Sequence, residues 1–153
     1  MQYGLLSRRE ILEHNIRFEE VADNNIIDKR TELGLDNCVP FHFHPYSAFD
    51  AAVKHTYDPQ RMIYICIDRE LARQNKFQIL PQHPLSDREC MLYEYDKGVQ
   101  KIDWETLMEV GRTDGYAREV KMAECLTNTS VPVEWFKCFY VPSDEVKKLW
   151  KIS

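Results

Sequence analysis

Alternating and continuous apolar runs predict four β-strands along this chain. The runs cover residues 38–44, 62–67, 77–80 and 135–141. In the first run Val39, Phe41 and Phe43 fall on one face, while a proline and two histidines fall on the other, because side chains alternate along a strand. The second run is apolar throughout, which is typical of a central strand.

Short helices are predicted between these strands, each beginning after a serine or an aspartate that can cap it. The capping residues are Ser47, Asp68, Asp103 and Ser143, and the helices cover residues 48–55, 69–74, 104–110 and a closing segment after residue 143. In the third helix we expect Trp104, Leu107 and Met108 to face inward. Strands interleaved with short helices indicate an α+β fold with a mixed sheet at its core.

Residues 119–126 support two interpretations, a strand or a helix. As a strand, the segment places Val120, Met122, Glu124 and Leu126 on one face. Glu124 is then a carboxylate on an otherwise apolar face, and such a residue is usually paired or functional because burying an unpaired charge is costly. As a helix, the segment leaves Glu124 exposed. A basic, glycine-containing loop over residues 111–118 precedes it.

The length and composition indicate one folded domain over residues 1–153. Apolar residues make up 44% of the chain, which is enough to bury a core, so disorder is not expected. The net charge of -5 argues against a surface that binds nucleic acid non-specifically, although a local basic groove is compatible with it.

The cysteines and the apolar runs bear on location. The five cysteines form no CxxC pair and mostly lie within apolar runs, which indicates reduced thiols in a cytoplasmic protein. The N-terminus lacks the pattern of a signal peptide. Because no apolar run approaches the roughly 20 residues that a membrane span needs, we expect no membrane partner.

Several cationic and titratable residues are candidates for chemistry. The guanidinium of Arg30 is a natural partner for a pyrophosphate or a base edge, although an arginine is more often a solvated surface group. His42 and His44 point the same way from a strand and could bind a metal, but no third ligand has a recognised spacing, so hydrogen-bonded histidines are favoured. His83 lies in a loop and could handle a substrate. The chain has no glycine-rich phosphate loop and no GxSxG motif.

With these residues in view, the chain resembles the DarT-type DNA ADP-ribosyltransferases, the toxins of bacterial DarT–DarG systems. The resemblance extends from about residue 3 to residue 150. It is carried by residues 26–30, 37–47, 83, 101–104 and 121–126. The most specific part is the run Val-Pro-Phe-His-Phe-His-Pro-Tyr-Ser at residues 39–47, and the order and spacing of the other parts support it.

The resemblance implies a fold and an activity. The fold would be an ADP-ribosyltransferase-like α+β fold with a split central sheet and short flanking helices. The activity would be transfer of ADP-ribose from NAD, used as a substrate and without a metal, to a base of single-stranded DNA. A macrodomain antitoxin similar to DarG would be the protein partner. The sequence does not distinguish thymine from guanine as the modified base.

The resemblance also implies roles for individual residues. Arg30 and Glu124 would be the catalytic arginine and glutamate, and His83 an active-site histidine. Arg30 would also contact NAD, together with Phe41, Phe43 and Ser47. In the loop that precedes Glu124, where this fold carries its substrate-recognition loop, the expected nucleic-acid contacts are Arg112, Tyr116 and Arg118.

Two features depart from the family pattern. The chain begins where an N-terminal strand and helix should already have ended, and in the family that strand carries a histidine that helps to hold NAD. Either the start is truncated, or this member has lost part of its NAD pocket. Residues 47–49 read Ser-Ala-Phe where the family more often has Ser-Pro-Met. The first departure motivates an alternative, a catalytically degenerate domain that binds nucleic acid or a protein partner. A third hypothesis is a small metal-binding domain built around His42 and His44.

Overall fold

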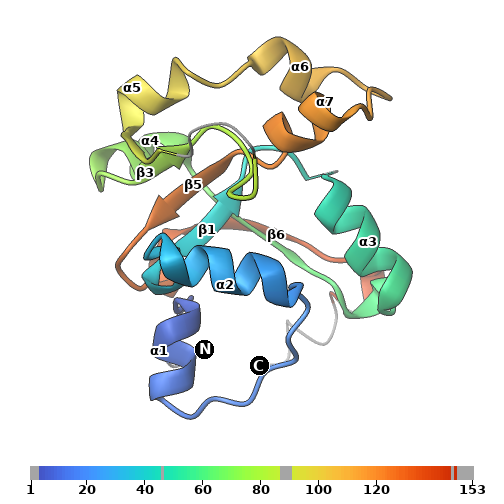
Figure 1. The fold of residues 1–153 in the computed structure, drawn as a ribbon. Helices are drawn as coiled ribbons and strands as arrows, with labels where there is room; N and C mark the ends of the chain where they lie inside the picture. Colours follow the sequence, from blue (N-terminus) through green and yellow to red (C-terminus); the bar gives the residue numbers. More distant parts are fainter. Residues whose placement is uncertain (1–3, 46, 87–90, 146, 148–153) are drawn as a thin grey trace.

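Two antiparallel β-sheets form the frame of the protein (Figure 1). The computed structural model describes residues 4–45, 47–86, 91–145 and 147. The strands are β1 (Val39–His42), β2 (Tyr64–Ile67), β3 (Gln78–Leu80), β4 (Tyr93–Glu94), β5 (Glu124–Thr127) and β6 (Phe136–Tyr140). The helices are α1 (Arg8–Glu13), α2 (Asn24–Glu32), α3 (Ala48–Thr56), α4 (Arg69–Gln74), α5 (Tyr95–Val99), α6 (Trp104–Met108) and α7 (Gly115–Val120), and 3₁₀ turns cover Leu35–Asn37, Pro59–Arg61 and Val133–Trp135.

The larger sheet has the strand order β1-β5-β3-β4, and the smaller sheet pairs β2 with β6. The predicted α+β class and the split sheet are therefore confirmed. The predicted mixed pairing is wrong, because every pairing among the described strands is antiparallel. Apolar patterning locates strands but does not give their direction, and here β5 runs opposite to both β1 and β3.

Strand β2 does not occupy the central position that its apolar run suggested. It belongs to the two-stranded sheet, and all four of its residues are only partly buried. Its side chains Ile65 and Cys66 border a cavity between the two sheets, so the apolar run lines a cleft and is not enclosed on both faces.

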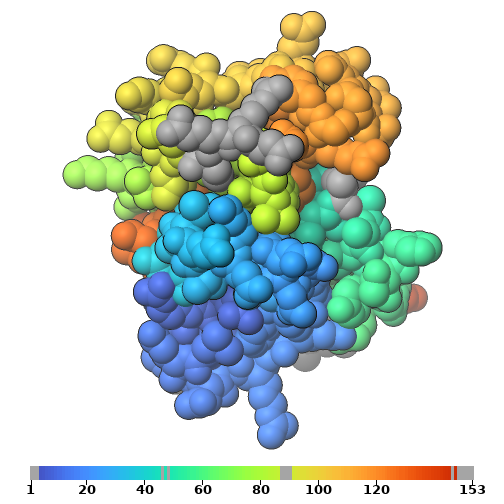
Figure 2. All heavy atoms as spheres, in the orientation of Figure 1, coloured from blue at the N-terminus to red at the C-terminus, as the bar shows by residue number. Residues whose placement is uncertain are grey.

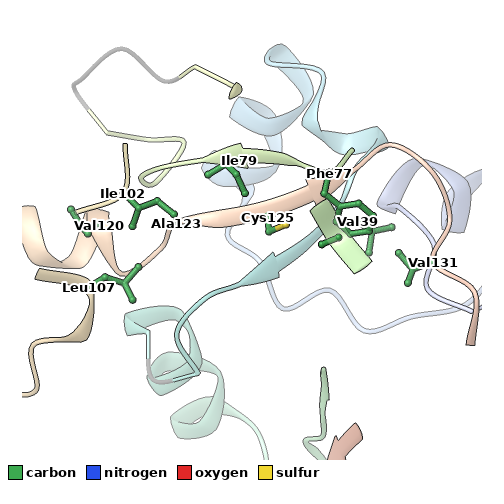
Figure 3. Packing of buried hydrophobic residues seen from close by; sticks show 10 residues of the cluster. Val39, Phe77, Ile79, Ile102, Leu107, Val120, Ala123, Cys125 and Val131 are labelled. Atoms are coloured by element: carbon green, nitrogen blue, oxygen red, sulfur yellow. The ribbon is translucent and has the colours of Figure 1, made fainter. Parts of the chain in front are cut away.

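The register of the larger sheet assigns its residues to two faces, since directly opposed residues in an antiparallel pair lie on the same face. Cys125 of β5 opposes Phe41 of β1 and Ile79 of β3, and this face carries the main hydrophobic core (Figure 3). Glu124 opposes His42 and Leu80 on the other face. A smaller apolar cluster lies beside them and contains Leu35, Cys38, Leu80 and Leu126.

The predicted helix caps are borne out where the structure describes them. The Ser47 hydroxyl accepts a hydrogen bond from the Asp50 N–H at 3.1 Å, and aspartates 68 and 103 cap α4 and α6 in the same way. Helix α6 ends at Met108, earlier than expected, and Met108 is 61% exposed, so its predicted inward orientation is wrong. The helix expected after residue 143 lies largely outside the described residues.

Residues 119–126 combine the two alternatives considered for them. Helix α7 ends at Val120, a turn follows, and β5 begins at Glu124. The region 111–118, expected to be a loop, is helical from Gly115 onward because the Asp114 carboxylate caps α7 by accepting the Ala117 N–H at 3.1 Å. Within the described ranges, no helix is long and apolar enough to cross a membrane.

Candidate functional site

Arg30 and Glu124 form a buried ion pair between α2 and β5. Asp23 caps α2, and Arg30 lies in the last turn of that helix. Its Nη1 donates to both carboxylate oxygens of Glu124, each at 2.8 Å. The Glu124 side chain is 4% exposed and the Arg30 side chain is 16% exposed. Of the two interpretations of this segment, the strand that buries Glu124 is therefore correct at this position, and the buried carboxylate is paired.

The second terminal nitrogen of Arg30, Nη2, takes no part in the ion pair. It is buried and has no hydrogen-bond partner among the described residues. A buried guanidinium nitrogen without a partner is costly, and an acceptor oxygen in the adjoining cavity would satisfy it.

The ion pair borders a cavity of about 780 Å³. Its walls come from α2, α3, β1, residues 83 and 85, and the segment from α7 to β5. Of these, α2 (blue), residues 81–86 (yellow-green) and α3 (green) meet on the face drawn in Figure 2. The polar groups that line the cavity are Asp23, Asn25, Arg30, His42, Thr56, Tyr57, His83, Arg118, Glu119 and Glu124.

His83 contributes to the cavity wall from the loop that follows β3. Burial is the main effect on its imidazole and lowers its pKa, while the nearby charge of Glu124 acts in the opposite direction. The Nδ1 atom accepts a hydrogen bond from the Leu85 N–H at 3.0 Å. A neutral His83 therefore carries its proton on Nε2, which can donate to a substrate. The structure thus brings the three predicted catalytic residues, 30, 83 and 124, to one cavity.

His42 is a cavity residue that the sequence interpretation did not include among the catalytic or NAD-binding residues. It lies directly opposite Glu124 in the β1–β5 pair, is exposed, and stacks on Phe49 with ring centroids 6.5 Å apart. No signal in the sequence indicated this pairing, because the register that places His42 opposite Glu124 depends on two segments far apart in the chain. His42 also borders a second cavity beside α3.

The second cavity has a volume of about 740 Å³ and lies between β1, α3 and β2. Phe41, Phe43 and Ser47, which were predicted to contact NAD, all line it. The two phenylalanines also pack against the core, with Phe43 edge-on to Trp104, and the Ser47 hydroxyl caps α3. Both cavities share Pro40, His42, Phe49 and Val53, so they adjoin across β1.

Of the three predicted nucleic-acid contacts, only Arg118 lines the first cavity. Arg112 forms ion pairs with Glu109 and Asp114, at 3.2 and 2.6 Å. The Tyr116 hydroxyl donates to Asp103 at 2.8 Å, so Arg112 and Tyr116 take part in a network that joins α6 to α7. Sequence proximity grouped these residues, but the turn of α7 separates Arg118 from the other two.

The described residues contain no group of three or more potential metal ligands. His42 and His44 therefore have no third ligand of this kind within the described part of the chain. Burial, and next the positive charge of Lys121, lower the pKa of His44, which keeps its imidazole neutral near pH 7. Within the described ranges, the geometry gives no support to the metal-binding hypothesis.

A sequence profile decides the family. The profile described as "ssDNA thymidine ADP-ribosyltransferase, DarT" matches residues 1–151. The chain belongs to the DarT family. Among curated proteins, none matches the chain significantly.

Solved DarT structures share the fold. "Thermus sp. 2.9 DarT in complex with ADP-ribosylated ssDNA" has a TM-score of 0.80 at 18% identity, over 99% of this chain and 80% of that one. "Thermus sp. 2.9 DarT in complex with NAD+" has a TM-score of 0.67 at 20% identity, over 77% of this chain and 65% of that one. "Thermosipho africanus DarTG in complex with ADP-ribose" has a TM-score of 0.75 at 21% identity, over 97% of this chain and 42% of that one. The match to the first Thermus structure is the most complete of the three, and the chain spans less than half of the DarTG protein.

Proposed function

We propose that this DarT-family chain transfers ADP-ribose from NAD+ to thymidine in single-stranded DNA. The observation that carries the proposal is the Arg30–Glu124 pair, because it fixes a carboxylate at the edge of a large cavity. The family profile supports the substrate and the reaction type. The solved Thermus structures, which contain NAD+ in one case and ADP-ribosylated single-stranded DNA in another, support the same pair of substrates.

Glu124 is proposed to stabilise the reacting ribose. When the bond between the ribose carbon and nicotinamide breaks, the bonding electrons leave with nicotinamide and positive charge develops on the ribose. A carboxylate held close to that carbon stabilises the charge electrostatically, as in glycoside cleavage. Arg30 fixes both carboxylate oxygens, so little reorganisation is needed during the reaction.

The acceptor is proposed to be the ring nitrogen of thymine that carries a proton. As that nitrogen bonds to the ribose carbon, its proton must leave, and Glu124 is the carboxylate placed to accept it. The free Nη2 of Arg30 and the Nε2–H of His83 can donate to oxygens of the base or of NAD+. These donors orient the two substrates for attack.

The adjoining cavities suggest how two substrates share the site. NAD+ is proposed to extend along the second cavity past Phe41, Phe43 and Ser47, and the DNA base to enter the first. The ribose would lie where the cavities meet, beside His42 and Glu124. Arg118 at the wall of the first cavity is proposed to pair with a DNA phosphate.

The biological setting is proposed by analogy with the family. A cell that makes a DNA-modifying toxin needs an antitoxin to neutralise it. The likeness to a DarTG structure supports a macrodomain antitoxin similar to DarG as the protein partner. NAD and chromosomal DNA are both present in the cytoplasm, so the reaction is proposed to take place there. The free cysteines among the described residues agree with a reducing compartment.

The proposal is tested by incubating the chain with NAD+ and a single-stranded oligonucleotide that contains all four bases, then measuring the intact mass. The expected product is heavier by one ADP-ribose, and fragmentation places the adduct on a thymidine. A matched oligonucleotide without thymidine is expected to remain unmodified.

Two results would change the proposal. An adduct on another base would retain the enzyme but reject thymidine as its target. No adduct on any oligonucleotide, from a protein that is folded by circular dichroism, would reject the activity and favour a domain that only binds nucleic acid or a protein.

A further inference from the structure

The loop that carries His83 is fastened to the end of α7 at two points. The His83 N–H donates to the main-chain carbonyl of Glu119 at 2.9 Å. The Ser86 hydroxyl donates to Oε2 of the Glu119 side chain at 2.8 Å. Because Glu119 holds both ends of this four-residue segment, its place at the end of α7 determines where the loop lies.

The same segment also fixes the ring of His83. The Ser86 N–H donates to the His83 carbonyl at 3.0 Å, which closes a turn, and the Leu85 N–H donates to Nδ1 at 3.0 Å. Protonation of Nδ1 would place two donors against each other and break the second contact. The turn therefore favours a neutral imidazole with its proton on Nε2.

Charged groups reach His83 from four elements. After burial, which lowers its pKa most, Glu124 on β5 and Glu119 on α7 raise the pKa, while Arg30 on α2 and His42 on β1 lower it. Glu119 lines the same cavity as Arg30 and Glu124. It therefore acts on His83 in two ways, through the position of the loop and through its charge.

From this geometry we propose that Glu119, with Ser86, is a positioning residue that holds the neutral imidazole of His83 toward the Arg30–Glu124 cavity. This role rests on the proposed function for its effect on catalysis. The position of His83 itself, and its titration, belong to the fold and can be measured without any reaction. Glu119 is not required to touch either substrate.

The test compares Glu119→Gln and Ser86→Ala with the wild type, and uses Glu109→Gln as the matched control. Glu109 precedes α7, pairs with Arg112 and does not line the cavity. The first readout is the pKa of His83, which is measured by NMR titration of the imidazole nitrogens. We expect this pKa to fall in Glu119→Gln, because a charge that raises it is removed, and to stay unchanged in Glu109→Gln.

The second readout is a double-mutant cycle in the transfer reaction. If Glu119 acts through His83, the combined variant His83→Ala/Glu119→Gln is no slower than His83→Ala alone. We expect Glu119→Gln to lower kcat roughly tenfold and to leave KM for NAD+ within about twofold. A neutral amide is a weaker acceptor for the Ser86 hydroxyl than a carboxylate, so the loop that carries His83 is held less firmly. The acidic limb of its pH profile should move to lower pH, following the His83 pKa.

An unchanged His83 pKa in Glu119→Gln would overturn the proposal, and so would additive losses in the double-mutant cycle. Both outcomes can be distinguished from a failure of the proposed function. If the wild type transfers no ADP-ribose, the enzyme assignment fails, yet the NMR titration still shows whether Glu119 acts on His83.

Discussion

At the scale of single residues, the central feature is the contact between Arg30 and Glu124, which are 94 positions apart in the chain. Apolar neighbours predicted that Glu124 is buried if its segment is a strand, and that inference holds. Its partner could not be identified from periodicity, because Arg30 resembles any surface arginine until α2 is placed beside β5. The resemblance to a family named both residues as catalytic candidates, but only the structure shows that they pair.

Removal of Arg30 tests whether the pair is also structural. Arg30→Ala leaves a buried carboxylate without its partner, and we expect the free energy of unfolding to fall by about 3 kcal/mol. Urea denaturation followed by circular dichroism measures the change. In Arg30→Ala/Glu124→Gln the unpaired charge is gone, so we expect about half of the loss to be recovered. Equal losses in both variants would indicate that packing of the arginine side chain matters more than the charge.

His83 should make folding stability depend on pH. Burial lowers its pKa in the folded state, so the unfolded chain binds more protons than the folded chain near pH 6. The stabilisation is fully present above the unfolded pKa of about 6.5 and is lost as pH falls through the folded pKa. We expect the Tm of His83→Gln to fall less between about pH 7 and pH 5 than that of the wild type. His44, whose pKa is also lowered, remains in both proteins and cancels in the comparison. A steeper fall in His83→Gln would reverse the assigned direction.

At the scale of elements, the sequence predicted where helices and strands lie along the chain better than it predicted which strands pair. The caps of α3, α4 and α6, and the existence of strands β1, β2, β3 and β6, follow from local chemistry. Strand direction and the place of β2 in the smaller sheet do not, because they depend on contacts between distant segments. The two-residue strand β4 was not predicted, since two residues are too few to show an alternation of apolar and polar side chains.

The packing of α5 on β3 requires a glycine. A Cβ added at Gly98 would lie 2.4 Å from the Cβ of Ile79, which is fully buried. Gly98→Ala is therefore expected to lower the free energy of unfolding by about 2 kcal/mol, because the core must shift to accept the methyl group. Gly115→Ala is the control, since a Cβ there meets no atom within 4 Å. Equal stability of the two variants in urea denaturation would show that α5 can move away from β3 at little cost.

At the scale of the whole molecule, two cavities of about 780 and 740 Å³ adjoin at the residues they share on β1 and α3. We propose that these cavities hold the dinucleotide and the DNA base together, with Arg118 supplying a local positive charge despite the net charge of -5. Through family resemblance, the sequence named candidates of which Arg30, His83, Arg118 and Glu124 line the first cavity. It did not indicate that the NAD-binding candidates divide between two cavities, with Arg30 at the first and Phe41, Phe43 and Ser47 at the second, because this depends on how α2 and α3 pack beside β1.

The measurement that tests the account most directly is the single-turnover rate of ADP-ribose transfer to a thymidine oligonucleotide by wild type, Glu124→Gln and Glu109→Gln. The account predicts that Glu124→Gln loses at least roughly 100-fold in rate while remaining folded, because it removes the charge that stabilises the transition state. Glu109→Gln, which removes an exposed carboxylate outside the cavity, should react within about twofold of wild type. A Glu124→Gln variant that transfers ADP-ribose as fast as the wild type would contradict the role of the Arg30–Glu124 pair.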